Sequence, residues 1–457
     1  MRGIRFLILL VICAGLGGWI YFVESKRDPA DTNAKDKVFT VESDKIDELV
    51  VKSESGDKTT LKKTGKDWQV VEPIATQPDG AAVSGLTSNL STLEMQRVID
   101  DNPGDLGEYG LTQPRIEVTF KAGGKEQHLQ IGRKTPAGTD LYAKLADQKR
   151  VFLIPSYVEA NLNKTTFDLR DKTVLKIERD KVEALTLTSS KGVLQFAKAD
   201  GEWKLTSPIK ARADFTSVDG IVSKLHTLQA KSIVAPQAQA LTEYGLDKPT
   251  ITITLGQGSS QATLLLGKAA GEGAIYAKDQ SRPMIVTVES SLDTDVTKDI
   301  GEFRQKDLLD GRPFNSTRLE VTRNGQTTTF EKAKTKNKEG QDEEKWKQTA
   351  PAAADVDQTT VDNLLAAITA ARATSFVDSA AKTNLDKPEV AISLTSDEGK
   401  RIEKLTLARN GSDGFAARDG ESGVAKVDAA TIDNIVKSLE GIKPPQPTTP
   451  PTPPSGK

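Results

Sequence analysis

EYGLTQP at residues 108–114 recurs as EYGLDKP at residues 243–249, and a third version reads KTNLDKP at residues 382–388. The third position of the phrase is Gly110, then Gly245, and finally Asn384. Gly and Asn are the residues that most readily take the left-handed backbone conformation, which is needed just past the end of a helix. The phrase therefore indicates a helix stop, used three times.

A Leu and a Pro complete this stop. Leu111, Leu246 and Leu385 follow the left-handed position, and Pro114, Pro249 and Pro388 come three residues later. In a Schellman-type stop, the residue after the left-handed position packs on the residue five before it. The expected pairs are Leu111 with Leu106, Leu246 with Leu241, and Leu385 with Ala380. We predict that each phrase ends a short helix and starts a strand, and that it carries no catalysis.

A tryptophan strand repeats in the same register. DWQVVEP, EWKLTSP and KWKQTAP place Trp68, Trp203 and Trp346 at intervals of 135 and 143 residues, with Pro73, Pro208 and Pro351 at the same offset. The segment after each Pro has apolar residues at spacings of 3, 4 and 3, which is one face of an amphipathic helix. These positions are Val83, Leu86, Leu90 and Leu93, then Val218, Ile221, Leu225 and Leu228, then Val361, Leu364, Ile368 and Ala371.

Short alternating segments surround these motifs and indicate half-buried antiparallel strands. Each unit reads as three strands, a helix, a short helix, four strands and a final helix, over about 135 residues. We predict an α+β fold of three tandem repeats, at residues 38–172 (repeat 1), 173–307 (repeat 2) and 308–442 (repeat 3).

The third copy carries one insertion, KAKTKNKEGQDEEK at residues 332–345, which we interpret as a solvated loop; a docking element is the alternative. A polar linker at residues 26–37 precedes the repeats. The chain ends in the Pro-rich segment 443–457, for which we expect an extended, disordered tail.

Residues 6–23, FLILLVICAGLGGWIYFV, carry no charge and would form a helix about 27 Å long, close to the ~30 Å hydrocarbon core of a bilayer. The segment ends in an aromatic cluster and lacks a small-x-small cleavage site, so we predict an uncleaved anchor within residues 1–25 rather than a signal peptide. The flanking charges do not decide its orientation. Because long domains translocate largely regardless of charge, we expect the body on the extracytoplasmic side of the inner membrane.

Composition excludes several classes. The 62 Lys and Arg residues nearly balance 64 Asp and Glu residues, so no global field attracts nucleic acid. The one cysteine, Cys13, lies in the anchor, which leaves the body without disulfides, zinc-thiolate sites or thiol catalysis.

No constellation of catalytic residues stands out either. The two histidines, His128 and His226, do not recur between copies, and carboxylate pairs such as Asp100 with Asp101 lie in polar loops. GKAAGEG at residues 267–273 lacks the residue order of a phosphate-binding loop. We expect no enzyme activity, no cofactor and no metal.

The tryptophans permit two interpretations. They are either core anchors against the repeated helix, which we favour, or stacking platforms for a sugar. Buried indoles would support a scaffold, whereas exposed, coplanar indoles along a groove would support a ligand-binding protein.

The anchor, the WxxxxP strand, the Leu-rich helix and the YGLxxP phrase together resemble the bacterial family catalogued as domain of unknown function 4340. The resemblance covers residues 38–442, with the third copy the most divergent. It implies a membrane-anchored repeat protein, often encoded beside ABC-type transporter components related to those of gliding motility, and no catalytic residues are established in the family. We therefore expect a non-enzymatic envelope accessory or scaffold protein with a protein partner, such as ABC-type transporter subunits; an envelope protein that binds glycan or cell-wall polymer is the alternative.

Overall fold

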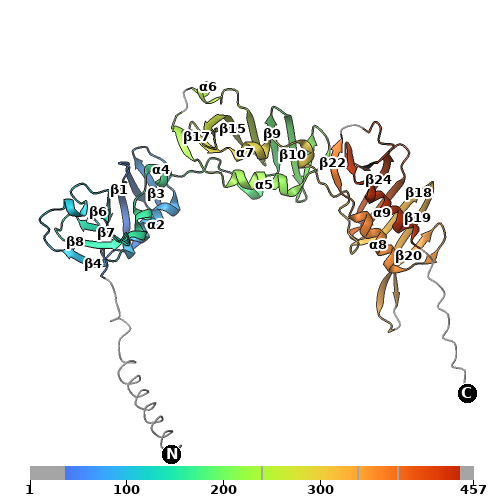
Figure 1. The fold of residues 1–457 in the computed structure, drawn as a ribbon, viewed down its shortest axis with the longest axis horizontal. Coiled ribbons are helices and arrows are strands. Elements are labelled where there is room, and N and C mark those ends of the chain that lie inside the picture. The colour runs from blue at the N-terminus through green and yellow to red at the C-terminus, as the bar shows by residue number, and fades with distance from the viewer. Residues whose placement is uncertain (1–35, 238–239, 337–338, 378–379, 443–457) are drawn as a thin grey trace, which may run out of the picture. The chain divides into compact units, whose positions relative to one another are not determined.

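The computed structural model describes residues 36–237, 240–336, 339–377 and 380–442 (Figure 1). The chain forms two compact units, one up to Lys172 and one from Thr173 on. Unit 1 contains one β-sheet and unit 2 contains two. The expected anchor at residues 6–23 and the Pro-rich tail lie outside the described residues. Within the described part of the chain, no helix is long and apolar enough to cross a membrane.

Unit 1 is an eight-stranded antiparallel sheet in the order β3-β2-β1-β5-β6-β7-β8-β4. Its strands are β1 (Ile46–Lys52), β2 (Lys58–Thr64), β3 (Asp67–Glu72), β4 (Arg97–Asp100), β5 (Ile116–Ala122), β6 (Lys125–Lys134), β7 (Asp140–Leu145) and β8 (Val151–Pro155). Helix α2 (Gly80–Thr92) connects the two edge strands, β3 and β4. Short helices α3 (Glu159–Leu162) and α4 (Thr166–Leu169) end the unit.

The first sheet of unit 2 has nine antiparallel strands in the order β12-β11-β10-β9-β14-β15-β16-β17-β13. They are β9 (Ala184–Ser189), β10 (Gly192–Ala199), β11 (Glu202–Ser207), β12 (Ala211–Arg212), β13 (Ser232–Ala235), β14 (Ile251–Gln257), β15 (Ser260–Gly271), β16 (Ala274–Asp279) and β17 (Ile285–Glu289). Its helices are α5 (Phe215–His226), α6 (Leu241–Tyr244) and α7 (Ser291–Val296).

The second sheet of unit 2 repeats this order as β21-β20-β19-β18-β23-β24-β25-β26-β22. Its strands are β18 (Ser316–Arg323), β19 (Gln326–Lys336), β20 (Asp342–Ala350), β21 (Ala354–Asp355), β22 (Ala373–Val377), β23 (Val390–Ser396), β24 (Arg401–Asn410), β25 (Asp413–Arg418) and β26 (Val424–Val427). Its helices are α8 (Gln358–Thr369) and α9 (Ala429–Glu440), which contact each other. The prediction of an α+β fold with mainly antiparallel sheets is confirmed.

The repeated helix begins the same way in each sheet. Asp79, Asp214 and Asp357 are the N-cap residues, and each side chain accepts a hydrogen bond from a backbone N–H of the first turn. Such caps stabilise a helix by about 1 kcal/mol. All twelve apolar positions that the sequence places on the inner face are buried, from 0 to 7% exposed. The helix therefore covers the core in every copy.

The strand after the helix was missing from the predicted order in every repeat, as were the two-residue strands β12 and β21 before the helix in repeats 2 and 3. β4, β13 and β22 follow the helix and pair with the last strand of the sheet. Their side chains are largely exposed or half-buried, so these four- and five-residue segments show no apolar alternation. Without that periodicity, the sequence gives no strand signal.

The interpretation of residues 332–345 as a solvated loop is wrong. Residues 332–336 and 342–345 lengthen the β19–β20 hairpin, with Lys332 opposite Trp346 and Lys336 opposite Asp342. Lys alternates with Ala and Thr on β19, acidic residues face it on β20, and an ion pair such as Lys336–Asp342 at 3.2 Å joins the two strands. Cross-strand pairs of opposite charge stabilise a hairpin without an apolar face, which a composition argument does not detect.

Candidate functional site

The three tryptophans lie on corresponding strands. Trp203 on β11 is 2% exposed and Trp346 on β20 is 3% exposed. Trp68 on β3 is half-buried and packs against the core of unit 1. The structure therefore places Trp203 and Trp346 in the core of unit 2 and Trp68 against the core of unit 1.

A lysine accompanies each tryptophan, and the sequence analysis missed it. Lys63, Lys198 and Lys332 lie directly opposite the indole on the neighbouring strand. The ammonium groups of Lys198 and Lys332 lie 5.5 and 5.2 Å from the ring centroids of Trp203 and Trp346, within cation–π range. In repeats 1 and 2 the signal was a Lys five residues before the Trp, which the insertion hides in repeat 3.

Asp219 on α5 organises the buried end of Trp203. Its carboxylate accepts hydrogen bonds from Arg179 Nη2 at 2.6 Å and from the Trp203 indole N–H at 3.4 Å. Burial alone would raise the pKa of Asp219, but the hydrogen bonds from Arg179 and Trp203 outweigh it and hold the pKa below its usual value. A paired carboxylate of this kind holds the strand on the helix and is not set up to exchange protons.

The prolines that follow the tryptophan strands share one geometry. The peptide bonds Glu72–Pro73, Ser207–Pro208 and Ala350–Pro351 are all cis. Each of these prolines directly follows its tryptophan strand, β3, β11 or β20. These residues shape the exit of the strand toward the helix.

In the first two copies, the YGL phrase forms the expected helix stop. Gly110 and Gly245 are left-handed, with φ of 68° and 70°. The N–H of Leu111 donates to the Leu106 carbonyl at 3.0 Å, and the N–H of Leu246 donates to the Leu241 carbonyl at 2.9 Å. Both leucines are buried. Strands β5 and β14 begin shortly after Pro114 and Pro249.

The third copy departs from this prediction. Asn384 is left-handed, with φ of 57°, but its phrase follows a turn and not a helix, and Leu385 is only half-buried. The turn is closed by the Thr383 hydroxyl, which donates to the Ala380 carbonyl at 2.6 Å, and Pro388 is exposed. The Asn384 side chain instead donates to the Arg409 carbonyl at 2.7 Å. The expected pairing of Leu385 with Ala380 is therefore replaced by a side-chain hydrogen bond.

A glycine on the neighbouring strand explains the difference. A Cβ added at Gly132 or Gly267 would lie 2.1 Å from the carbonyl oxygen of Tyr109 or Tyr244, respectively, so only glycine admits the helix stop there. Repeat 3 has Ala408 at this position, directly after Leu407 as Gly132 follows Ile131 and Gly267 follows Leu266, and its chain takes the other path. Ala408 pairs with Phe415 on the next strand, whereas both glycines lie in a register shift. The matched IGR and LGK triplets were the available signal, and the sequence analysis did not use it.

The other candidate groups lie apart. His128 contacts Glu117 at 3.2 Å on the sheet surface, and His226 contacts the Ile177 carbonyl at 3.2 Å. Asp101 pairs with Arg150. Among the residues that the structure describes, no group of three or more His, Cys, Asp or Glu side chains could hold a metal ion.

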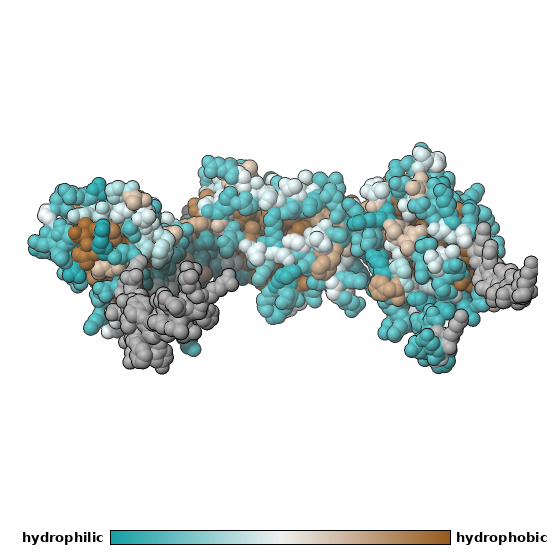
Figure 2. Space-filling view, turned by 60° about the horizontal axis from the view of Figure 1, so that its bottom comes forward, coloured by the Kyte–Doolittle hydropathy of each residue, from teal (hydrophilic) through white to brown (hydrophobic). Residues whose placement is uncertain are grey.

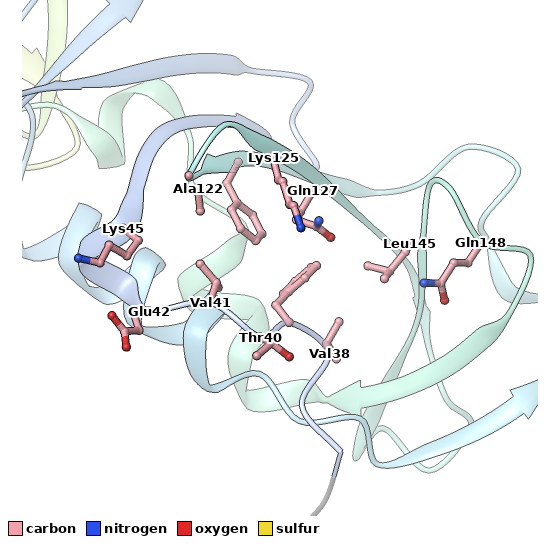
Figure 3. A pocket seen from close by; sticks show the side chains of 13 residues that line it. Val38, Thr40, Val41, Glu42, Lys45, Ala122, Lys125, Gln127, Leu145 and Gln148 are labelled. Atoms are coloured by element: carbon pink, nitrogen blue, oxygen red, sulfur yellow. The ribbon is translucent and has the colours of Figure 1, made fainter.

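Unit 1 has a pocket of about 560 Å³. Residues Val38–Lys45 form one wall, Lys125 and Gln127 at the start of β6 form the next, and Leu145 and Gln148 close the third (Figure 3). The buried rings of Phe39 and Phe120 form its apolar floor. A pocket of this size, with an apolar floor and polar rim, is typical of a binding site.

Within unit 2, repeats 2 and 3 meet in a cluster of charged side chains. Arg212 of β12 reaches repeat 3, where its Nη1 lies 2.5 Å from Asp310 and its Nε lies 2.6 Å from Glu421. Arg418 pairs with the same Glu421 at 3.1 Å and with Glu403 at 2.7 Å. The Arg212 side chain is only 11% exposed, and the Glu403 side chain only 1%.

Backbone groups complete this cluster. Glu403 accepts hydrogen bonds from the N–H groups of Asp310 and Gly311 at 2.8 and 2.7 Å, and Ser422 N–H donates to the Lys210 carbonyl at 2.7 Å. Arg304 stacks on Phe376, with its guanidinium carbon 3.9 Å from the ring centroid. Since buried charges are tolerated only when paired, the junction is a specific contact.

The surface adds few further candidates. On the face seen in Figure 2, hydrophilic residues predominate and the hydrophobic areas are small. The large hydrophobic residues with the most exposure are Phe314, Tyr157 and Ile402, at 83, 75 and 64%. Single exposed hydrophobic residues are normal, so these three alone identify no binding surface.

A comparison with protein families supports the repeat pattern. The family model described as Domain of unknown function (DUF4340) matches residues 68–204 and again residues 203–388. The chain belongs to this family. The two matches to DUF4340 begin at Trp68 and Trp203, and Trp346 lies within the second match. No curated protein matches the DUF4340 chain.

Two solved structures show a weak similarity to the DUF4340 chain. The DnaN sliding clamp (DNA polymerase III subunit beta) from Pseudomonas aeruginosa bound to griselimycin has 10% identity over 86% of this chain and 93% of the clamp, with a TM-score of 0.16. The DNA polymerase III subunit beta from the same organism has 10% identity over 85% and 94%, with a TM-score of 0.14. Scores this low do not indicate a shared fold.

Proposed function

We propose that this DUF4340 protein is a non-enzymatic accessory or scaffold protein of the bacterial cell envelope, held at the inner membrane by residues 6–23 with its body outside the cytoplasm. ABC-type transporter subunits are the candidate partners. The observation that carries the proposal is the burial of Trp203 and Trp346 at 2 and 3% exposure. Because the repeated motifs form the core, contacts with other proteins would be made by the surface residues of the repeats.

The electrostatics of the repeated motif support the same proposal. Asp219 is held in its charged form by Arg179 and Trp203, whereas a general acid or base works best with a pKa near the working pH. Tandem domains on one anchor also present several related faces at high effective concentration, which favours assembly.

Binding of glycan or cell-wall polymer is the alternative. It needs exposed indoles along a groove, and the half-buried Trp68 is the one repeated tryptophan with substantial exposure. Sedimentation of the protein with purified peptidoglycan, compared with a Trp68→Ala variant, tests this alternative. Loss of co-sedimentation in the variant would favour polymer binding over the scaffold role.

The proposal is tested by purification from detergent-solubilised membranes. The full chain is compared with a chain that lacks residues 1–25, and both are probed for ABC-type transporter subunits by mass spectrometry. We expect the full chain to remain in the membrane fraction after alkaline extraction and to co-purify with a membrane protein. Absence of any membrane-protein partner in both preparations would refute the accessory role, and release by alkaline extraction would refute the anchor.

A further inference from the structure

The pocket of unit 1 corresponds, position by position, to the place in repeat 3 where Arg212 is bound. We call that place the repeat-3 socket and define it by Asp310, Arg401, Glu403, Arg418 and Glu421. Arg212 contacts Asp310 and Glu421 directly, and Arg418 joins these two carboxylates to Glu403. Arg401 pairs with Asp310 at 3.0 Å.

Strand register establishes the correspondence. Phe120 faces Gln127 in unit 1 as Leu394 faces Glu403 in repeat 3. Ala122 faces Lys125 as Ser396 faces Arg401.

The remaining walls correspond by their hydrogen bonds. Gln148 N–H donates to the Leu145 carbonyl, as Glu421 N–H does to Arg418. The segment that leads into each sheet is anchored in the same way. Val38 N–H donates to the Leu93 carbonyl in unit 1, and Leu308 N–H donates to the Ala371 carbonyl in repeat 3. Because Thr40 and Asp310 each lie two residues after these anchors, the two positions match. The pocket-lining residues Thr40, Lys125, Gln127, Leu145 and Gln148 therefore match the five residues of the repeat-3 socket.

The charges of the two places differ in a systematic way. The repeat-3 socket supplies three carboxylates and two guanidinium groups, and it binds an arginine. In the pocket of unit 1, the matched positions of those carboxylates are neutral, as Thr40, Gln127 and Gln148, while Lys125 keeps the positive charge of Arg401. Glu42 and Lys45 also line the pocket, and Lys45 pairs with Asp44 at 3.5 Å. At the positions matched to the repeat-3 socket, the pocket of unit 1 therefore has one cation, Lys125, and no carboxylate, so this part of the pocket suits a carboxylate.

Repeat 3 carries a carboxylate, Asp355, at the position that corresponds to Arg212 of repeat 2. β12 pairs Arg212 with Lys204, and β21 pairs Asp355 with Lys347 at the same place in the sheet. The Asp355 side chain is 73% exposed and lies 3.5 Å from the Lys347 ammonium, an exposed pair that leaves the carboxylate accessible. The outer side of β12 is paired with residues 303–305, whereas no such pairing covers β21 in the described part of the chain.

We propose that the pocket of unit 1 binds the β21 edge of a second copy of this chain, with Asp355 of that copy beside Lys125. The contact repeats the internal junction: Ala353 carbonyl would accept from Lys149 N–H as Lys210 carbonyl accepts from Ser422 N–H. The two surfaces differ, so the association is head-to-tail: the copy that uses its pocket keeps its β21 edge, and the copy that uses its edge keeps its pocket. This interface goes beyond the proposed function, because it requires no envelope partner.

Single cysteines test the interface in the full chain in detergent. Cys13→Ser removes the native thiol. Lys149 and Ala353 are both exposed, and a backbone hydrogen bond between them would bring their Cα atoms within disulfide range. We expect an equal mixture of the Lys149→Cys and Ala353→Cys chains to form a cross-linked dimer under mild oxidation, and neither chain alone to do so. Lys58→Cys, exposed on the same sheet, replaces Lys149→Cys in the control mixture. Equal yields from both mixtures would overturn the proposal.

A charge swap gives an independent test. Light scattering of the full chain in detergent measures association of the Lys125→Glu and Asp355→Lys chains, and we expect each to associate about tenfold more weakly than the natural chain. The two changes together should restore association, while Lys58→Glu should leave it unchanged. Circular dichroism checks that every variant is folded. Association of the double variant as weak as that of either single variant would overturn the proposed pairing.

If the cross-link forms but no membrane-protein partner is found, the self-association stands and the accessory role fails. If a partner is found but no head-to-tail cross-link forms, the reverse holds.

Discussion

Replacing Gly267 with Ala tests why the YGL phrase depends on a glycine in the next strand. The added methyl group would lie 2.1 Å from the Tyr244 carbonyl oxygen, 3.2 Å from the Gly245 carbonyl carbon and 3.2 Å from a Leu246 methyl carbon. Real Cβ atoms essentially never approach within 3.0 Å of another atom, so the backbone of the helix stop must move by about 1 Å. Because two of the opposing atoms are backbone, this adjustment cannot occur by a rotamer change.

We expect Gly267→Ala to destabilise the first sheet of unit 2 by about 3 kcal/mol, the upper end of overpacking effects. The matched control is Gly220→Ala in α5, where an added Cβ meets no atom within 4 Å. That change should stabilise the helix by about 0.5 to 1 kcal/mol, because Gly is a poor helix former.

Hydrogen–deuterium exchange with peptide resolution is the suitable assay, because a chain with several sheets need not unfold in one step. Exchange should rise in Gly267→Ala at residues 241–255, which contain the helix stop and β14, and should stay unchanged in unit 1. If residues 241–255 exchange at the same rate in Gly267→Ala as in the natural chain, the claim that the backbone contact excludes a side chain is refuted.

Three further predictions concern the core and the internal junction of unit 2. Trp203→Ala should destabilise the first sheet of unit 2 by about 3 to 5 kcal/mol, seen as faster hydrogen–deuterium exchange at residues 184–207, because the indole is buried. Arg212→Ala should cost about 1.5 to 3 kcal/mol, seen as faster exchange at the repeat 2–repeat 3 boundary, since Asp310 and Glu421 each lose one guanidinium partner and keep Arg418. The pKa of Asp219 is lower in the folded chain than in the unfolded chain, so its charged form stabilises the fold at pH values above the unfolded-state pKa. This stabilisation is lost as the pH falls through the folded-state pKa. In Asp219→Asn, the stability of unit 2 should therefore depend less on pH over this acidic range. Acid titrations of Asp219→Asn that match the natural chain would contradict this assignment.

Strong periodicity explains what the sequence predicts well. The positions Val218, Ile221 and Leu225 mark the buried face of α5 because apolar residues at helical spacing have one physical solution. The sequence predicts the helix stop well in repeats 1 and 2 for a similar reason, because Gly110 and Gly245 indicate a left-handed backbone conformation.

The remainder depends on contacts between distant segments. The failure at Asn384 follows from Ala408 on another strand, and the register of Lys332 with Trp346 turns the insertion into an extended hairpin. The repeat-3 socket was also hidden, because Arg212 and Glu421 are far apart in the sequence and neither belongs to a repeated motif. Local patterns carry no information on such pairs.

The path of the chain through each sheet has a consequence for synthesis. In unit 1, the central pairing joins Leu49 to Phe120, and the sheet is complete only when Arg97 meets Leu153. The nascent polypeptide therefore holds several unpaired strands until nearly the whole repeat has left the ribosome, and contacts this distant in sequence form slowly. A nascent chain stopped anywhere before β8 exposes open strand edges, which makes it a substrate for chaperones or for aggregation. The complete repeat is thus the shortest length of unit 1 at which every strand of its sheet has a partner.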